Sequence, residues 1–195
     1  MENKIIEAAR TTFLKKGFKD TNMADIAAEV GLTRPAMHYY FRTKERLFQA
    51  VFGDILMSFV PKIKDSISRD MGLKEKISEI VDTYLAVLQV SPQLPLFIIQ
   101  EINRDIDNIV SIAIDNNLME LGMSLMQAIN REMDEGRIRK MPLIQLCYTF
   151  YGLMMVPFLG RPVGLKVFGQ DSTDKEFLET WKENVISQMV HQLKP

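Results

Sequence analysis

Apolar residues recur at helical spacing along almost the whole of this 195-residue chain. The clearest case is the segment 74–90, where Ile77, Ile80, Val81, Tyr84 and Leu88 fall on one stripe of a helix. The sequence contains no alternation of apolar and polar residues bounded by hairpin turns, which is the usual signal for strands. The pattern therefore predicts an all-α fold.

Glycines, prolines and capping residues divide this pattern into about nine helices. Two of them are very short and open after Asn22 and Thr33, whose side chains can cap them. Gly17 is expected to end the first helix, and Gly31 to form the turn between the two short ones. Residues 160–169, rich in Gly and Pro, are expected to form a loop. The other helices are expected at about 3–16, 43–64, 74–90, 96–107, 109–135, 143–159 and 173–193.

Composition excludes several classes of protein. With 24 Lys and Arg against 25 Asp and Glu, the chain cannot bind nucleic acid through bulk positive charge, so such binding would be local. A single cysteine, Cys147, excludes an internal disulfide and a multi-thiolate metal site, and it fits the reducing cytoplasm. The most apolar run, 143–159, is shorter than the roughly 20 residues of a spanning helix, so we expect a buried helix and no membrane partner.

The stretch 21–47 has the pattern of a helix-turn-helix. Its apolar positions can pack two short helices against each other: Ile26, Ala27, Val30, Leu32, Met37 and Phe41. The three consecutive rings of His38, Tyr39 and Tyr40 cannot all face a core, because successive helical residues diverge by about 100°. Arg34 can donate two hydrogen bonds to a guanine, and hydroxyl groups can reach phosphates. These residues favour contact with a nucleic-acid groove.

A second interpretation stays open on the residues alone, because any small helical corner buries apolar residues at these intervals. The chain would then be a helical ligand-binding or protein-interaction module that does not bind DNA specifically.

Residues 3–50 resemble the DNA-binding domain of the tetracycline-repressor (TetR) family of bacterial transcriptional regulators. The likeness lies in IIEAARTTFLKKGFKDT, MADIAAEVGLT, HYYF and KERLF. It implies a three-helix DNA-binding domain at 1–48, followed by a larger helical domain at 49–195 that binds an effector and dimerises. It also implies that double-stranded operator DNA is contacted by Thr21, Thr33, Arg34, Pro35, His38, Tyr39, Tyr40 and Lys44. Pro35 replaces the glycine that the family favours, and His38 replaces a tyrosine, so we expect the groove contact near Arg34 to be shifted.

The resemblance further implies a ligand pocket among the helices of the larger domain. The chain has 13 Met, whose flexible side chains suit irregular cavities. In the helix expected at 109–135, Leu118, Leu121, Leu125 and Ile129 form one row beside a row of methionines. Core filling is the alternative for any of these residues, and a salt bridge with Arg104 for Glu101. The candidates for binding a small, largely apolar effector are Tyr84, Leu88, Phe97, Glu101, Met119, Met123, Met126, Tyr151, Met154 and Phe158.

The expected last helix, 173–193, has apolar residues over about 220° of its circumference, whereas packing against one surface requires about 100°. It is either buried in the middle of its own domain or packs with one side on the core and the other on a partner subunit. The second interpretation predicts a homodimer with Phe177, Trp181, Val185, Gln188 and Met189 at the interface.

Catalytic motifs are not found. The sequence lacks GxGxxG and GxxxxGK[ST] loops, a GxSxG elbow, and HExxH and CxxC pairs, and its two histidines lie far apart in the chain. We therefore expect no enzyme and no cofactor, and we predict a cytoplasmic, homodimeric repressor that a ligand releases from its operator.

Overall fold

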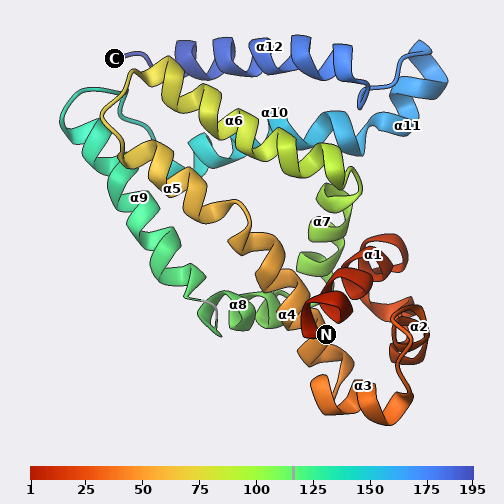
Figure 1. The fold of residues 1–195 in the computed structure, drawn as a ribbon. Coiled ribbons are helices and arrows are strands. Elements are labelled where there is room, and N and C mark those ends of the chain that lie inside the picture. Colours follow the sequence, from red (N-terminus) through yellow and green to blue (C-terminus); the bar gives the residue numbers. More distant parts are fainter. Residues whose placement is uncertain (116) are drawn as a thin grey trace. The chain divides into compact units, whose positions relative to one another are not determined.

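The computed structural model describes residues 1–115 and 117–195, and all regular structure in this part is helical (Figure 1). The all-α prediction is confirmed. In chain order the elements are α1 (Glu2–Asp20), α2 (Met23–Glu29), α3 (Arg34–Tyr40), α4 (Lys44–Met57), α5 (Val60–Ser68), α6 (Leu73–Val90), α7 (Leu94–Arg104), α8 (Ile106–Asp115), α9 (Leu118–Asp134), α10 (Leu143–Leu159), α11 (Arg161–Val163), the π-helix η1 (Gly164–Phe168) and α12 (Lys175–Leu193).

The chain forms two compact units. The N-terminal unit consists of Met1–Ser58 and Leu96–Leu118, and the C-terminal unit of Phe59–Pro95 and Met119–Pro195. The backbone therefore passes from one unit to the other three times. The functional division after residue 48 stays a prediction.

The capping residues act where the sequence places them. The side chains of Asn22, Thr33 and Thr43 accept hydrogen bonds from backbone N–H groups at the starts of α2, α3 and α4, at 2.9, 3.4 and 3.2 Å. These bonds satisfy donors that have no partner within the first turn of a helix. At Gly17 the backbone leaves the helical conformation (φ 74°, ψ 173°), as expected, and one further turn follows up to Asp20.

Two predicted helices are each divided in the structure. The helix expected at 43–64 ends at Met57 and restarts at Val60. Pro61 has no N–H to donate to the carbonyl of Met57, and its ring blocks a continuous helix at that point. The helix expected at 109–135 is divided between α8 and α9, where Asn117 adopts a left-handed conformation (φ 55°) that asparagine tolerates.

The prediction of a loop at 160–169 is wrong, because α11 and η1 occupy most of it. Pro162 lies in the first turn of α11, where a missing N–H removes no intrahelical hydrogen bond.

A cluster of phenylalanines forms the centre of the N-terminal unit. The ring of Phe48 lies 5.4 Å from Phe13 edge-on, 5.7 Å from Phe52 and 6.0 Å from Phe97, centroid to centroid. All four side chains are buried. At about 1.5–3 kcal/mol for each buried ring, this cluster is a main source of the unit's stability, and it fixes α1, α4 and α7 together.

In the C-terminal unit, α12 packs against α6 and α10. Pro157 inside α10 cannot donate to the carbonyl of Leu153, four residues earlier. The indole Nε1–H of Trp181 on α12 donates to that carbonyl at 2.9 Å. A side chain from another helix thus replaces the backbone donor that the proline removes.

Within residues 1–115 and 117–195, no helix taken singly has both the length and the hydropathy for crossing a membrane; two bent pairs of consecutive helices meet this test only jointly.

Candidate nucleic-acid interface and ligand pocket

The turn between α2 and α3 is built from backbone hydrogen bonds. The N–H of Gly31 donates to the carbonyl of Ala28 at 3.1 Å, and the N–H of Leu32 to that of Ala27 at 2.8 Å. This is the Schellman arrangement, which needs a residue with positive φ at the position of Gly31 (φ 72°). The glycine thereby sets the direction in which α3 leaves α2, and the helix-turn-helix prediction agrees with this geometry.

Helix α3 has one buried and one exposed side. Met37 is 1% exposed, and Phe41 after the helix is also buried, so both anchor it to the unit. On the other side Tyr39 is 85% exposed, and its ring meets that of Tyr40 edge-on at 5.4 Å. The predicted residues exposed here are Thr33, Arg34, Pro35, His38, Tyr39 and Tyr40.

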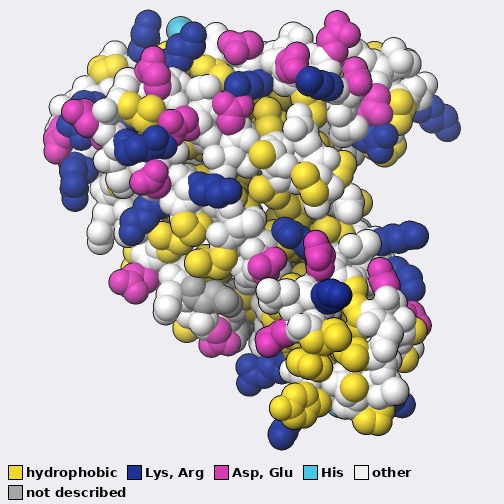
Figure 2. Space-filling view, in the orientation of Figure 1, with side chains coloured by type: hydrophobic (Ala, Val, Ile, Leu, Met, Phe, Trp, Pro, Cys, Tyr) yellow, Lys and Arg dark blue, Asp and Glu magenta, His cyan; other side chains and the backbone are white. Residues whose placement is uncertain are grey.

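The exposed side of α3 has no acidic residue, and Figure 2 shows apolar and basic side chains together at this end of the N-terminal unit. Arg42, which follows α3, is also exposed. Sequence reasoning missed it, although it lies between two proposed contacts.

Because a carbonyl can only accept, the 3.0 Å contact between His38 Nδ1 and the carbonyl of Arg42 places a proton on Nδ1. Nε2 of a neutral His38 is then an acceptor, which suits the amino group of an adenine or cytosine.

Two predicted DNA contacts, Thr21 and Lys44, make hydrogen bonds within the unit. The Thr21 hydroxyl is buried and donates to the carbonyl of Gly17 at 2.7 Å. The Lys44 ammonium donates to the carbonyls of Phe18, Lys19 and Thr21 at 2.9, 3.2 and 3.0 Å. These bonds use all three of its hydrogens, so Lys44 ties the end of α1 to the start of α4.

Phe18 joins this connection to α7. Its ring makes cation–π contacts with the Lys44 ammonium, 4.5 Å from the centroid, and with the Arg104 guanidinium, at 4.2 Å. Its backbone N–H donates to Glu101 Oε1 at 3.1 Å, and Arg104 Nε donates to the other Glu101 oxygen at 2.6 Å. Glu101 is 3% exposed. It therefore makes the alternative interaction named for it, a salt bridge, and lies in the unit that carries α3.

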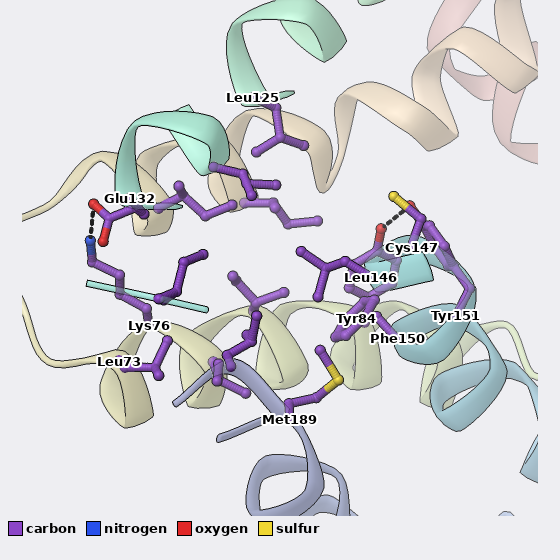
Figure 3. Close-up of a pocket in the computed structure, with 17 residues that line it drawn as sticks. Leu73, Lys76, Tyr84, Leu125, Glu132, Leu146, Cys147, Phe150, Tyr151 and Met189 are labelled. Atoms are coloured by element: carbon purple, nitrogen blue, oxygen red, sulfur yellow. Dashed lines mark hydrogen bonds and ion pairs between the residues drawn. The ribbon is translucent and has the colours of Figure 1, made fainter. Parts of the chain in front are cut away.

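A largely apolar cavity lies in the C-terminal unit, with an empty volume of about 870 Å³ including open solvent at its mouth (Figure 3). Helices α5, α6, α9, α10 and α12 contribute its walls. The lining residues are Ile63, Ile67, Leu73, Lys76, Ile77, Ile80, Tyr84, Leu125, Ile129, Glu132, Ile138, Leu146, Cys147, Phe150, Tyr151, Met189 and Leu193.

Of the predicted ligand residues, Tyr84 and Tyr151 line this cavity. Phe97 belongs to the aromatic cluster of the other unit. Helix α9 presents to the cavity Leu125 and Ile129, which belong to the leucine and isoleucine row seen in the sequence. The predicted residues that are buried but do not line the cavity are Leu88, Met154 and Phe158, and those about half exposed are Met119, Met123 and Met126.

Two polar pairs lie in the cavity wall. The hydroxyls of Tyr84 and Tyr151 are 2.7 Å apart, and burial raises the pKa of both, that of Tyr84 well above its usual value, so both stay protonated. The Lys76 ammonium donates to Glu132 Oε1 at 3.1 Å. Arg137 donates twice to the same carboxylate, at 2.9 and 3.0 Å, and these bonds are the main cause of the lowered pKa of Glu132. Among the described residues, no group of three or more His, Cys, Asp or Glu side chains is arranged to hold a metal ion.

The predicted dimer residues on α12 differ in their exposure. Val185 and Met189 are buried in the unit, and Phe177 stacks on Trp181 at 5.9 Å. Gln188 is exposed. Helix α10 presents an exposed apolar stripe that sequence reasoning missed, formed by Ile144, Tyr148 and the outer edge of Tyr151. Its signal is the spacing of four and three residues within a run otherwise read as buried.

Comparison with known proteins supports the resemblance. Residues 5–51 match the model of the family described as bacterial regulatory proteins, tetR family. The HTH-type transcriptional regulator TtgR of Pseudomonas putida is 33% identical over 92 residues, 47% of this chain and 41% of that protein. YfiR of Bacillus subtilis (strain 168), an uncharacterized HTH-type transcriptional regulator, is 40% identical over 78 residues, 40% of this chain and 38% of that protein. The matched segments thus span about two fifths of these curated relatives.

The fold is shared more widely. A TetR family transcription regulator from Marinobacter aquaeolei VT8 superposes with a TM-score of 0.70 at 20% identity, over 95% of this chain and 93% of that one. The fatty acid degradation regulator FadR from Bacillus halodurans gives 0.67 at 18% identity, over 95% and 94%. The matched family is one of regulators and not of enzymes, as the sequence predicts. Residues 5–51 of this chain thus match the model of the tetR family of bacterial regulatory proteins, and the chain shares the fold of solved tetR-family regulators over nearly its whole length.

Proposed function

We propose that this chain is a cytoplasmic, homodimeric transcriptional repressor that leaves its operator when a small, largely apolar ligand fills the cavity of the C-terminal unit. The observation that carries the proposal is the two-sided character of α3. Met37 and Phe41 anchor the helix, whereas Arg34, His38 and Tyr39 are exposed. An aromatic ring that is 85% exposed adds little to folding, so Tyr39 favours DNA binding over a purely architectural helical corner.

The proposed contacts follow from position. Arg34 is the first residue of α3, and the N-terminal residues of a recognition helix reach base edges in the major groove. The Tyr39 and Tyr40 hydroxyls and Thr33 suit phosphates, with Arg42 as an additional cation. Thr21 and Lys44 would act by positioning α1 and α4 under α3. In a dimer, two such helices would enter major grooves roughly 34 Å apart, one turn of DNA.

The α4–α5 junction is the proposed route of ligand response. Tyr84 in the cavity wall packs against Phe59 with ring centroids 5.1 Å apart. Phe59 directly follows Ser58, the last residue of the N-terminal unit before the chain crosses. A ligand that moves Tyr84 would thus move the residue next to the crossing. A coupling of about 1–3 kcal/mol between ligand and DNA would lower operator affinity about 5- to 150-fold.

The proposed dimer interface combines α10 and α12. Their exposed residues Ile144, Tyr148 and Gln188 would meet the same residues of a second copy around a two-fold axis. Val185 and Met189 would support this surface from beneath, since both are buried in their own chain.

Selection of bound DNA in vitro, followed by gel-shift titration, tests DNA recognition. Arg34→Ala should weaken binding to the selected operator about 5- to 150-fold, as expected for loss of a bidentate base contact worth about 1–3 kcal/mol, without changing the thermal midpoint. The control is Arg131→Ala, which removes the same charge from an exposed position on α9. Equal affinities of the two variants, or no discrete complex at micromolar protein, would favour the non-DNA-binding module.

A further inference from the structure

We infer that the cavity binds a linear amphiphile with one carboxylate, whose head group lies at Lys76 and whose chain runs along α6 towards Tyr84. The inference rests on the proposed function in taking this cavity as the effector site. It adds the chemical class of the ligand and the residue that selects it.

The cavity has polar groups at its two ends and apolar side chains between them. Figure 3 shows Lys76 and Glu132 at one end and Tyr84, Tyr151 and Cys147 at the other. The walls between them consist mainly of leucine and isoleucine side chains, among them Ile77 and Ile80 of α6. A charged ligand group can be satisfied only at an end, because the middle offers it no partner.

The Lys76 end favours an anion. The Lys76 side chain is 11% exposed, and its ammonium, which has three hydrogens, donates to one acceptor among the described residues, Glu132. The carboxylate of Glu132 accepts twice more, from Arg137, and would keep these two partners if Lys76 turned away. A ligand carboxylate can therefore take hydrogen bonds from Lys76 without leaving Glu132 unpaired. A ligand cation would find Glu132 already occupied.

Other charges around this end do not alter the preference. Arg137 also pairs with Glu135, and the side chains of both are about half exposed, so water screens them. Lys76 and Glu132 are the two charged groups that line the cavity itself. The ligand carboxylate would meet the shielded cation of this pair.

The tyrosine end does not require a second polar group. The hydroxyls of Tyr84 and Tyr151 bond to each other at 2.7 Å, and both rings offer apolar faces. Lys76 and Tyr84 are eight residues apart on α6, or about 12 Å at 1.5 Å per residue. An extended chain of roughly ten carbon atoms covers this span, given C–C bonds of about 1.5 Å in a zigzag. A saturated monocarboxylate therefore matches both ends.

The test compares head groups at constant chain length. Isothermal titration of the full-length protein should give tighter binding for decanoate than for decanol or decylamine, by about tenfold or more, as expected for a hydrogen-bonded charge pair. Lengthening the chain from octanoate to decanoate should tighten binding about fourfold per methylene, because each is buried. Equal affinity for decanoate and decanol, or no binding of octanoate, decanoate, dodecanoate or tetradecanoate, would overturn the inference.

A matched pair of variants tests the role of Lys76. Lys76→Met keeps an unbranched apolar side chain, so it should abolish the preference for decanoate over decanol while decanol still binds. Lys74→Met removes the same charge from an exposed position on the same helix and should leave the preference intact. Continued binding of decanol by Lys76→Met shows that the cavity is folded. If this variant keeps the preference, the carboxylate does not bind at Lys76.

Gel shifts separate this inference from the proposed function. Decanoate that binds the protein without changing operator affinity would leave the ligand class standing and remove the effector role. Specific operator binding without binding of any carboxylate would remove the ligand class and leave the proposed DNA recognition standing.

Discussion

At the residue scale, several side chains form hydrogen bonds with backbone groups at the ends and breaks of helices. Lys44 donates to three carbonyls at the end of α1, Glu101 accepts a hydrogen bond from the N–H of Phe18, and Trp181 donates to the carbonyl that Pro157 leaves without a helical donor. Unpaired buried backbone groups cost about 1–3 kcal/mol each, which explains why long, charged or aromatic side chains are used in this way. The sequence predicted an external partner for Lys44, and for Glu101 and Trp181 it left an external and an internal partner open, because a polar or aromatic residue near a motif does not reveal which atom it reaches.

The bond of Trp181 can be tested by a double-mutant cycle. Trp181→Phe should destabilise the chain by about 1–3 kcal/mol in urea denaturation, since the carbonyl of Leu153 loses its donor. In a Pro157→Ala background, the backbone of the introduced alanine supplies the helical N–H to that carbonyl. The cost of Trp181→Phe should then fall by about 1 kcal/mol or more. An unchanged cost in both backgrounds would mean that ring packing, and not the hydrogen bond, is what the tryptophan provides.

At the scale of elements, the starts and turns of the short helices were predictable. Asn22, Thr33, Thr43 and Gly31 act within three or four residues of themselves, so their roles can be read from a short window. The breaks near Pro61 and Asn117 were missed. Proline is compatible with a first helical turn, and a left-handed asparagine has no distinctive neighbours, so neither gave a clear signal within a longer helical pattern.

Two glycines, one in the turn after α2 and one inside α9, should respond in opposite ways to alanine. Gly31→Ala forces a side chain into a left-handed conformation and should destabilise the protein by about 1–2 kcal/mol, although no atom would clash with the new Cβ. Gly122→Ala, inside α9 and equally free of contacts, should stabilise by about 0.5–1 kcal/mol through helix propensity. Chemical unfolding of the two variants measures both. A loss of stability in both would show that contacts, and not backbone conformation, decide the outcome.

At the scale of the whole molecule, the proposed dimer has a direct test. Tyr148 is 72% exposed on α10, so Tyr148→Asp should leave the fold intact while placing a charge in the apolar interface. Light scattering after gel filtration should then report a monomer, and operator binding should weaken because the two half-sites are no longer linked.

Val90→Asp provides the control for this variant. Val90 is at least as exposed, at the end of α6 in the same unit, and its replacement should leave the dimer intact. A dimeric Tyr148→Asp variant would place the interface elsewhere.

The sequence by itself determined the helical class, the starts of the short helices and the two sides of α3, because these depend on interactions between residues a few positions apart. The tertiary structure decided which residues line the cavity and which merely lie near it. Glu101 meets Phe18 across 83 residues and Tyr84 meets Tyr151 across 67, so their partners depend on how distant helices pack. An apolar stripe shows that one face of a helix will be buried. Which helix packs against that face depends on how all the helices bury their apolar stripes together.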